Sequence, residues 1–199
     1  MQPHESLGLL SGIIFGAAFV PYITSILRKE RPAIPVRASW LIWSINGTIA
    51  FFAGTRDPST ACFWILLAGA AGPIITFLCS LKHTGPVSKV QITSLVIAAF
   101  SFGLYKMTQN ATVMMLLVIV ADGCGTWPTF LEVRKNPENE DKLAWASWSL
   151  GVTLNLAATI LKPGETSWTD WIFAVWMFIG ANAVTSQVAY GLIKMKKRT

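Results

Sequence analysis

Asp122 is the residue whose type and position most favour chemistry. It is the one acidic residue inside the seven long apolar stretches of this 199-residue chain. A charged side chain in the middle of a membrane-spanning segment costs at least about 2.5–3.5 kcal/mol, so such residues usually serve a function. We therefore expect Asp122 to bind a substrate and to couple proton movement to it. The alternative is a carboxyl group that only bonds to a neighbouring helix.

Three asparagines inside the apolar stretches could line a polar cavity together with Asp122. They are Asn46, Asn155 and Asn182. Asparagines often bond across helix interfaces, at about 0.6 kcal/mol on average, so helix packing is the alternative for each. We interpret all three as candidate substrate-binding residues.

Two pairs of tryptophans occur at a spacing of three, Trp40 with Trp43 and Trp145 with Trp148. Residues at this spacing share one face of a helix. For Trp40 and Trp145, at the start of their stretches, an aromatic belt at the membrane surface is the expected role. Trp43 and Trp148 lie about one turn deeper, where an indole could stack against a bound solute. A belt position is the alternative for this deeper pair.

Two prolines, Pro21 and Pro128, occupy corresponding positions late in their apolar stretches. A proline removes one backbone hydrogen bond and can kink a helix. We predict that they act as hinges, although membrane helices also tolerate proline without any motion. The small residues Gly123 to Gly125 directly follow Asp122 and would let a helix or a ligand approach the backbone closely.

Enzymatic chemistry has no candidate residues. His4 and His83 both lie outside the apolar stretches, and the chain holds no HExxH or GxSxG pattern. We therefore expect no enzyme, no metal site and no cofactor.

The composition indicates a protein that folds in lipid. It is 53% hydrophobic and 13% charged, against roughly 25% charged in an average soluble domain. Seven stretches approach the roughly 20 apolar residues that cross a bilayer as a helix. The predicted spans are 7–27, 38–54, 61–81, 90–105, 111–131, 143–161 and 171–193. No room is left for a soluble catalytic or nucleic-acid-binding domain.

The positive charges are unevenly distributed between the two sides that these seven spans would define. Three basic residues fall on one side, Arg56, Lys106 and Lys162. The other thirteen fall on the opposite side: Arg28, Lys29, Arg31, Arg37, Lys82, Lys89, Arg134, Lys135, Lys142, Lys194, Lys196, Lys197 and Arg198. By the positive-inside rule, the C-terminus is expected in the cytoplasm and the N-terminus outside.

The chain contains an internal repeat. The pattern around Pro21 recurs 107 residues later around Pro128, and each copy is followed by a basic turn. Trp40-Leu-Ile-Trp-Ser recurs as Trp145-Ala-Ser-Trp-Ser, and Trp64-Ile as Trp171-Ile. We predict two three-helix units at 1–83 and 110–199, joined by a linker helix within 84–109. The linker gives both units the same orientation, as in parallel-repeat transporters.

These residues resemble the PQ-loop and SWEET-like superfamily, closest to uncharacterised bacterial members. The resemblance rests on Pro21 and Pro128, the basic turns and the tryptophan-rich start of each second helix. At the positions of the family's signature glutamines this chain has Tyr22 and Thr129 instead. It implies a three-plus-one-plus-three helical fold that transports a small polar solute such as a sugar, an amino acid or a vitamin-like molecule. It also points to Asn182 as a substrate-binding residue.

Two functions remain open. The first is a transporter that works by alternating access, whose partners are a small solute and membrane lipid and which could form homo-oligomers. The second is a non-transporting receptor or assembly subunit, since the same superfamily includes a sorting receptor. Binding of a peptide or protein without any flux would distinguish the second.

Overall fold

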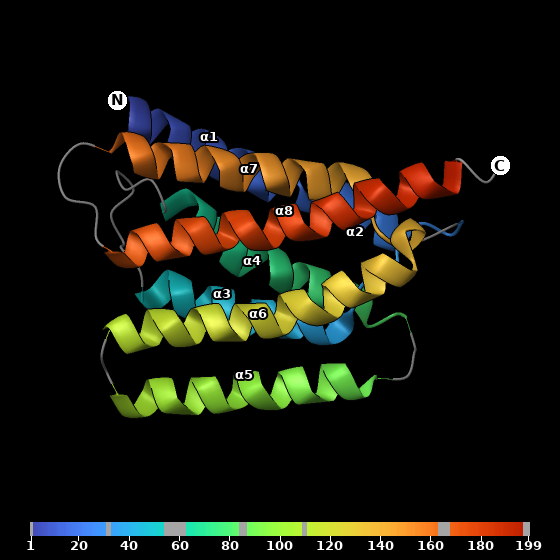
Figure 1. Ribbon diagram of the computed structural model, residues 1–199, viewed down its shortest axis with the longest axis horizontal. Coiled ribbons are helices and arrows are strands. Elements are labelled where there is room, and N and C mark those ends of the chain that lie inside the picture. Colours follow the sequence, from blue (N-terminus) through green and yellow to red (C-terminus); the bar gives the residue numbers. More distant parts are fainter. Residues whose placement is uncertain are drawn as a thin grey trace.

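A computed structural model describes residues 2–30, 33–53, 63–83, 87–108, 111–162 and 168–196 (Figure 1). Within these ranges all regular structure is helical and no strand occurs, which confirms the prediction of an all-helical protein, while the three-plus-one-plus-three repeat stays a prediction. The elements are α1 (Pro3–Ala17), α2 (Phe19–Leu27), α3 (Arg37–Ala53), α4 (Phe63–Ser80), α5 (Lys89–Thr108), α6 (Ala111–Lys135), the short 3-10 helix η1 (Pro137–Asn139), α7 (Lys142–Leu161) and α8 (Trp168–Lys196). Outside the described residues lie Arg31, Gly54, Arg56, Ala61, Cys62, Lys197 and Arg198, which the predictions above include.

The first predicted span is a pair of helices in one rod, with a break at Ala18. Pro21 explains the break, because it has no N–H to donate and its ring crowds the carbonyl four residues earlier, that of Ala17. Pro128 has a different effect. Helix α6 continues through it to Lys135, and its C-terminal part bends away from α5 (Figure 1).

Five of the described helical segments are long and apolar enough to cross a membrane, which indicates an integral membrane protein. They are Pro3–Leu27, Phe63–Ser80, Met115–Lys135, Lys142–Leu161 and Trp171–Gly191. Helix α3 has 17 residues, and the apolar stretch found among the described residues of α5 is the shorter Lys89–Ser101. For these two helices a membrane crossing stays a prediction.

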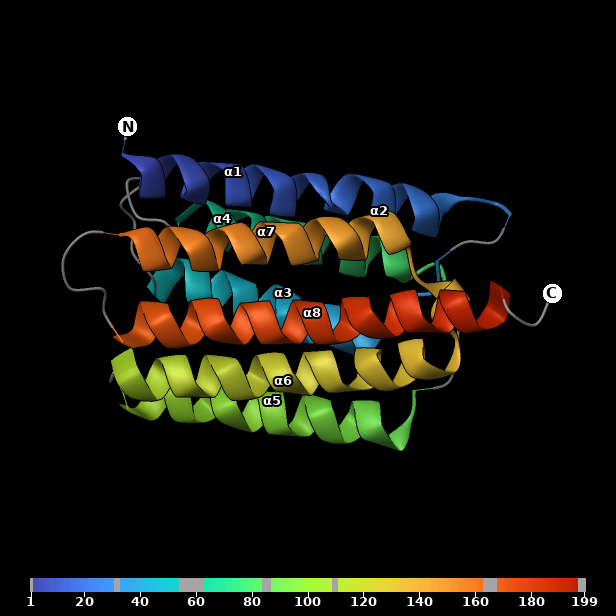
Figure 2. The same ribbon diagram turned by 45° about the horizontal axis from the view of Figure 1, so that its top comes forward.

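The helices form a ring that leaves α5 outside. Around the ring the order is α1, α4, α3, α6, α8, α7 and back to α1, each packed against the next. Helix α5 packs against α6 and, to a lesser extent, α3, and it lies at the edge of the bundle in both ribbon views (Figures 1 and 2). A Cβ atom at Gly12 would collide with Trp64 of α4, and one at Gly47 would collide with the backbone of Gly69, so these glycines are what lets the neighbouring helices approach so closely.

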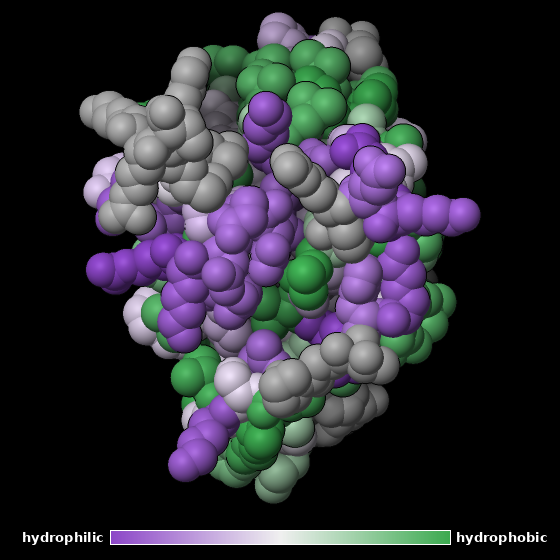
Figure 3. Space-filling model, turned by 90° about the vertical axis from the view of Figure 1, so that its right-hand side faces the viewer, coloured by the Kyte–Doolittle hydropathy of each residue, from purple (hydrophilic) through white to green (hydrophobic). Residues whose placement is uncertain are grey.

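The surface of the bundle matches a lipid environment. Large apolar side chains are exposed around its outside, among them Val20, Phe52, Phe100, Leu143 and Ile179. At the end that carries the C-terminus, polar residues gather and apolar residues border them (Figure 3). The N-terminus lies at the opposite end (Figure 1).

The described basic residues of the larger group all belong to the polar end of the bundle, which we call the basic end. They are Arg28, Lys29, Arg37, Lys82, Lys89, Arg134, Lys135, Lys142, Lys194 and Lys196, the last residue of α8. The connections that follow α2 and α6 meet here. The backbone N–H of Ile34 donates to the carbonyl oxygen of Asn139 at 2.9 Å, which fastens one connection to the other.

Candidate functional site

A cavity of about 110 Å³ lies inside the ring of helices. Its walls come from α1, α2, α3, α4, α6, α7 and α8, and none of the described residues of α5 is among them. Four of the six predicted substrate-binding residues line it: Trp43, Asn46, Asp122 and Trp148. Asn155, Asn182 and the predicted hinges Pro21 and Pro128 are not among the lining residues. The structure thus brings the acid and both deeper tryptophans to one place.

Asp122 is half-buried in the middle of α6, and two donors hold its carboxylate. The indole Nε1 of Trp176, on α8, donates to Oδ2 at 2.8 Å, and the hydroxyl of Thr126 donates to the same oxygen at 3.3 Å. No described residue donates to Oδ1. One carboxylate oxygen is therefore held in place, and the other has acceptor capacity for a ligand. No sequence pattern distinguishes Trp176 from the other aromatic residues of its helix.

The glycines that follow Asp122 make room for two tryptophans. A Cβ atom at Gly125 would lie 2.5 Å from Nε1 of Trp43, whereas one at Gly123 would lie 3.4 Å from the ring of Trp176, an ordinary contact distance. Gly125 comes three residues after Asp122 and therefore shares its face of α6. Because Trp43 lies directly against Gly125, the Trp43 indole and the Asp122 carboxylate are neighbours on the cavity wall.

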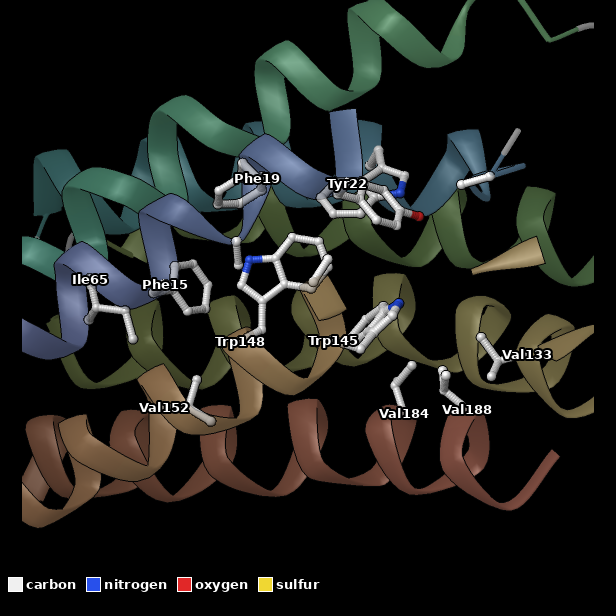
Figure 4. Packing of buried hydrophobic residues seen from close by; sticks show 14 of the residues in the cluster. Phe15, Phe19, Tyr22, Ile65, Val133, Trp145, Trp148, Val152, Val184 and Val188 are labelled. Atoms are coloured by element: carbon white, nitrogen blue, oxygen red, sulfur yellow. The ribbon is translucent and has the colours of Figure 1, made fainter. Parts of the chain in front are cut away.

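An aromatic cluster closes the cavity on the side toward the basic end (Figure 4). Trp148 lies at its centre, with ring centroids 5.1 Å from Phe19, 5.1 Å from Tyr22 and 5.0 Å from Trp145. Trp40 joins it at 5.7 Å from Trp148. Trp40 and Trp145 are only 2% and 5% exposed, so the prediction of a membrane-surface belt is wrong for these two residues.

Trp148 also carries a polar group without a partner. Its side chain is 4% exposed, and among the described residues its indole N–H finds no acceptor. A buried donor left without a partner costs about 1–3 kcal/mol. Because Trp148 lines the cavity, an acceptor atom on a bound solute could satisfy this N–H.

Two of the predicted asparagines join helices to each other. The amide nitrogen of Asn46 donates to the carbonyl oxygen of Val118 at 3.1 Å, which links α3 to α6 at the cavity wall. Asn182 accepts a bond from the Ser149 hydroxyl at 2.6 Å, which fastens α7 to α8. Its amide nitrogen donates to the Phe178 carbonyl at 2.8 Å, within α8. Both contacts are of the packing kind that formed the alternative interpretation.

The third asparagine, Asn155, lies between α1 and α7. It is fully buried, and neither its amide nitrogen nor its oxygen has a hydrogen-bond partner among the described residues. The antiparallel helices α1 and α7 bring Phe15 against Gly151, so one turn further along Asn155 is placed opposite Ser11. The Ser11 hydroxyl is also buried and without a described partner.

A second buried acid, Glu140, lies outside the membrane-spanning segments and was not singled out in the sequence. It is 9% exposed and accepts a bond from the Trp145 indole Nε1 at 2.8 Å. Burial raises the pKa of Glu140 from 4.5 to about 7, with smaller contributions from the neighbouring charges of Asp141 and Glu132, while the bond from Trp145 acts in the opposite direction. The residues around Glu140 are rich in charges and asparagine, a composition typical of an ordinary polar loop.

Comparisons with known proteins bring no relative to this site. No family model matches the chain, and no curated protein and no solved structure matches it. The cavity and the helices around it are therefore the evidence for the function of this protein.

Proposed function

We propose that this protein is a membrane transporter for a small polar solute, such as a sugar, an amino acid or a vitamin-like molecule, which works by alternating access about the central cavity. The observation that carries this proposal is the cavity itself, inside a ring of apolar helices, with the half-buried carboxylate of Asp122 on its wall. A charge at this depth is costly, so an ionisable residue that is kept there usually marks a functional site. Asp122 would bind the solute, a coupling proton, or both in turn.

The packing of the helices supports a three-plus-one-plus-three repeat of the SWEET-like kind. In the first triplet the third helix, α4, packs against both α1 and α3, and in the second triplet α8 packs against both α6 and α7. The triplets meet through α1 with α7 and α3 with α6. Each of these contacts joins the first helix of one triplet to the second helix of the other, as a twofold axis along the membrane normal requires.

The proposed orientation places the basic end in the cytoplasm and the N-terminus outside, in a bacterial inner membrane or another plasma membrane. The charge distribution supports this orientation. It requires α3 and α5 to cross the membrane along with the five longer segments. In this orientation the aromatic cluster is the cytoplasmic gate of the cavity.

Pro21 and Pro128 would let this gate open. Both lie on the cytoplasmic side of the cavity in the proposed orientation, Pro21 next to the break at Ala18 and Pro128 within the bent part of α6. Phe19 and Tyr22 of the cluster sit on the same short helix as Pro21. Movement of this helix would therefore separate their rings from Trp148.

Uptake into proteoliposomes tests the proposal. Purified protein is assayed with a panel of sugars, amino acids and vitamins, with and without a pH gradient. Asp122→Asn should reduce uptake at least tenfold, because it removes the charge from the cavity wall. The matched control is Glu138→Gln, the same acid-to-amide change at an exposed position of η1, which should transport normally.

Wild-type protein that moves no solute of a broad panel under either condition would overturn the transporter proposal. Capture of a peptide or protein partner by the same preparation, without any flux, would point to the receptor function instead.

A further inference from the structure

We infer that the central cavity selects a small organic cation, with its positive charge held between Asp122 and Trp43 and its apolar body among the other aromatic side chains. This inference rests on the proposed function, because it names the class of solute that the transporter would carry. It narrows the panel of polar solutes to amines that bear a small apolar or aromatic group.

The charge of the cavity favours a cation. Among the described residues that line it, Asp122 is the one ionisable side chain. A solute with a carboxylate or phosphate group would meet no basic partner there, and the carboxylate of Asp122 would repel it. A buried charge without a partner is costly, so with Asp122 ionised the cavity favours cations over anions.

The geometry of Asp122 suits an ammonium group. Its Oδ2 already accepts bonds from Trp176 and Thr126, which fixes the plane of the carboxylate. Oδ1 accepts none from the described residues, and it can accept a charge-assisted bond from a ligand N–H. The site is thus held ready for a single cationic donor.

The position of Trp43 provides the second contact for a cation. Its indole lies against Gly125, three residues from Asp122 on the same face of α6. A cation near an indole face is attracted by the π electrons, and tryptophan is the best of the aromatic side chains in this role. A carboxylate and an indole on one cavity wall thus offer a positive charge two favourable contacts.

The polar groups of the cavity are too few for a sugar. The amide nitrogen of Asn46 is bonded to the backbone of α6, and the hydroxyl hydrogen of Thr126 is used by Asp122. The indole N–H of Trp148 has no partner among the described residues, and the indole of Trp43 places a second N–H donor on the wall. A sugar with several hydroxyl groups would leave most of them unsatisfied. An ammonium group has three N–H donors, of which one bonds Oδ1 of Asp122, while attraction to an indole face compensates for part of the others.

The volume of the cavity limits the ligand to a small one. It measures about 110 Å³, less than the roughly 150 Å³ of an apolar cavity known to hold benzene. An amine with a short branched chain is therefore of the right size, and an amine with one small ring enters once the aromatic side chains move apart and enlarge the cavity.

Three probes of nearly the same shape test the inference by titration calorimetry on the detergent-solubilised full chain: benzylammonium, neutral benzyl alcohol and anionic benzoate. Benzylammonium should bind at least tenfold more tightly than the other two, since a charge-assisted bond contributes about 1.5–3 kcal/mol. Equal binding of the cation and the alcohol, or tighter binding of benzoate, would overturn the inference.

Two variants locate the binding site. Asp122→Asn should abolish the preference for the cation over the alcohol, and Trp43→Phe should weaken benzylammonium binding about threefold to tenfold. Trp127→Phe, the same change at an exposed position of α6, is the control and should bind as the wild type does. If Asp122→Asn fails to fold, the comparison of the three probes on wild-type protein still decides the charge preference.

Flux measurements separate this inference from the transporter proposal. Uptake of sugars or zwitterions with no binding of benzylammonium would overturn the cation preference and leave the transporter proposal in place. Selective binding of benzylammonium without flux of any solute would keep the cation site and overturn transport.

Discussion

Single residues at the cavity wall depend on one another. Asp122 is oriented by Trp176, and Trp43 packs against α6 three residues from Asp122 because Gly125 has no side chain in its way. The two glycines on either side of Cys124 are therefore not equivalent, although the sequence suggests that they are. One lies in close contact with an indole and the other leaves ordinary space.

Gly125→Ala should destabilise the protein by about 1–3 kcal/mol, because the added methyl group meets the Trp43 indole in a packed site. Gly123→Ala is the matched control. It places a methyl group at an ordinary distance from Trp176 and gains helix propensity of up to about 1 kcal/mol, so its stability should equal or exceed that of the wild type. Thermal unfolding in detergent compares the two, and equal losses in both would contradict this account of Gly125.

Glu140 should make stability depend on pH. Burial favours its neutral form, so the folded protein keeps this proton up to about pH 7, whereas the unfolded chain loses it near pH 4.5. The free energy of unfolding should therefore fall as the pH rises between these values, by about 3 kcal/mol in total.

Unfolding of wild type and Glu140→Gln across pH 4.5–8 measures this effect. The variant cannot ionise and should lose the pH-dependent decrease, while Glu138→Gln at the exposed neighbouring site should retain it. A decrease of the same size in Glu140→Gln would assign it to another group.

Individual site residues could be predicted where the signal was a residue type out of place. Asp122 stands out as an acid in an apolar stretch, and Trp43 and Trp148 stand out by their spacing. Trp176 and Glu140 could not be found in this way. Trp176 is one of several aromatic residues in its helix, and Glu140 is buried by the helices packed around its loop, which no local pattern encodes.

At the level of the helices, proline has two different effects. Pro21 lies in the first turn of α2, and the chain breaks three residues before it, at Ala18. Pro128 lies inside the longer α6, which bends but continues. The same residue type thus gives a break in one half and a bend in the other.

Pro21→Ala should close the break at Ala18 by restoring an N–H donor for the carbonyl of Ala17. If α2 moves during transport, turnover in proteoliposomes should fall severalfold while the affinity for a bound solute changes less than twofold. Val20→Ala, at the lipid-facing position next to it, keeps the proline and is the control. Unchanged turnover in Pro21→Ala would remove the hinge role.

Helix positions could be predicted from the sequence, but helix ends could not. The apolar criterion ends the fifth span at residue 131, whereas α6 continues to Lys135. Polar residues can extend a helix beyond the membrane, and here Arg134 and Lys135 interact favourably with the partial negative charge of the helix C-terminus. Likewise, the first helix begins at Pro3 rather than at residue 7.

At the level of the whole molecule, an odd number of crossings requires the two termini to face opposite sides of the membrane. The described bundle has its termini at opposite ends (Figure 1). The distribution of basic residues along the sequence predicts which of the two ends faces the cytoplasm. The order of the helices around the ring could not be predicted, because it depends on close contacts such as Gly12 against Trp64.

Cysteine labelling in intact cells tests this orientation. In a background in which Cys62, Cys79 and Cys124 are replaced by alanine, Gln2→Cys should react with a membrane-impermeant maleimide, because the N-terminus faces outward. Lys194→Cys should react only after the membrane is permeabilised. Labelling of both sites from the same side would contradict the seven crossings.

The peripheral position of α5 separates two kinds of genetic defect. Since the described part of this helix contributes nothing to the cavity wall, substitutions within it should leave ligand recognition intact in whatever protein reaches the membrane correctly. In the proposed topology their harm would arise earlier, when the ribosome and the insertion machinery insert the second triplet in the same direction as the first. If the proposed transport function holds, patterns of tolerated variation along α5 should follow the demands of biogenesis, and those along α3 and α6 the demands of the solute.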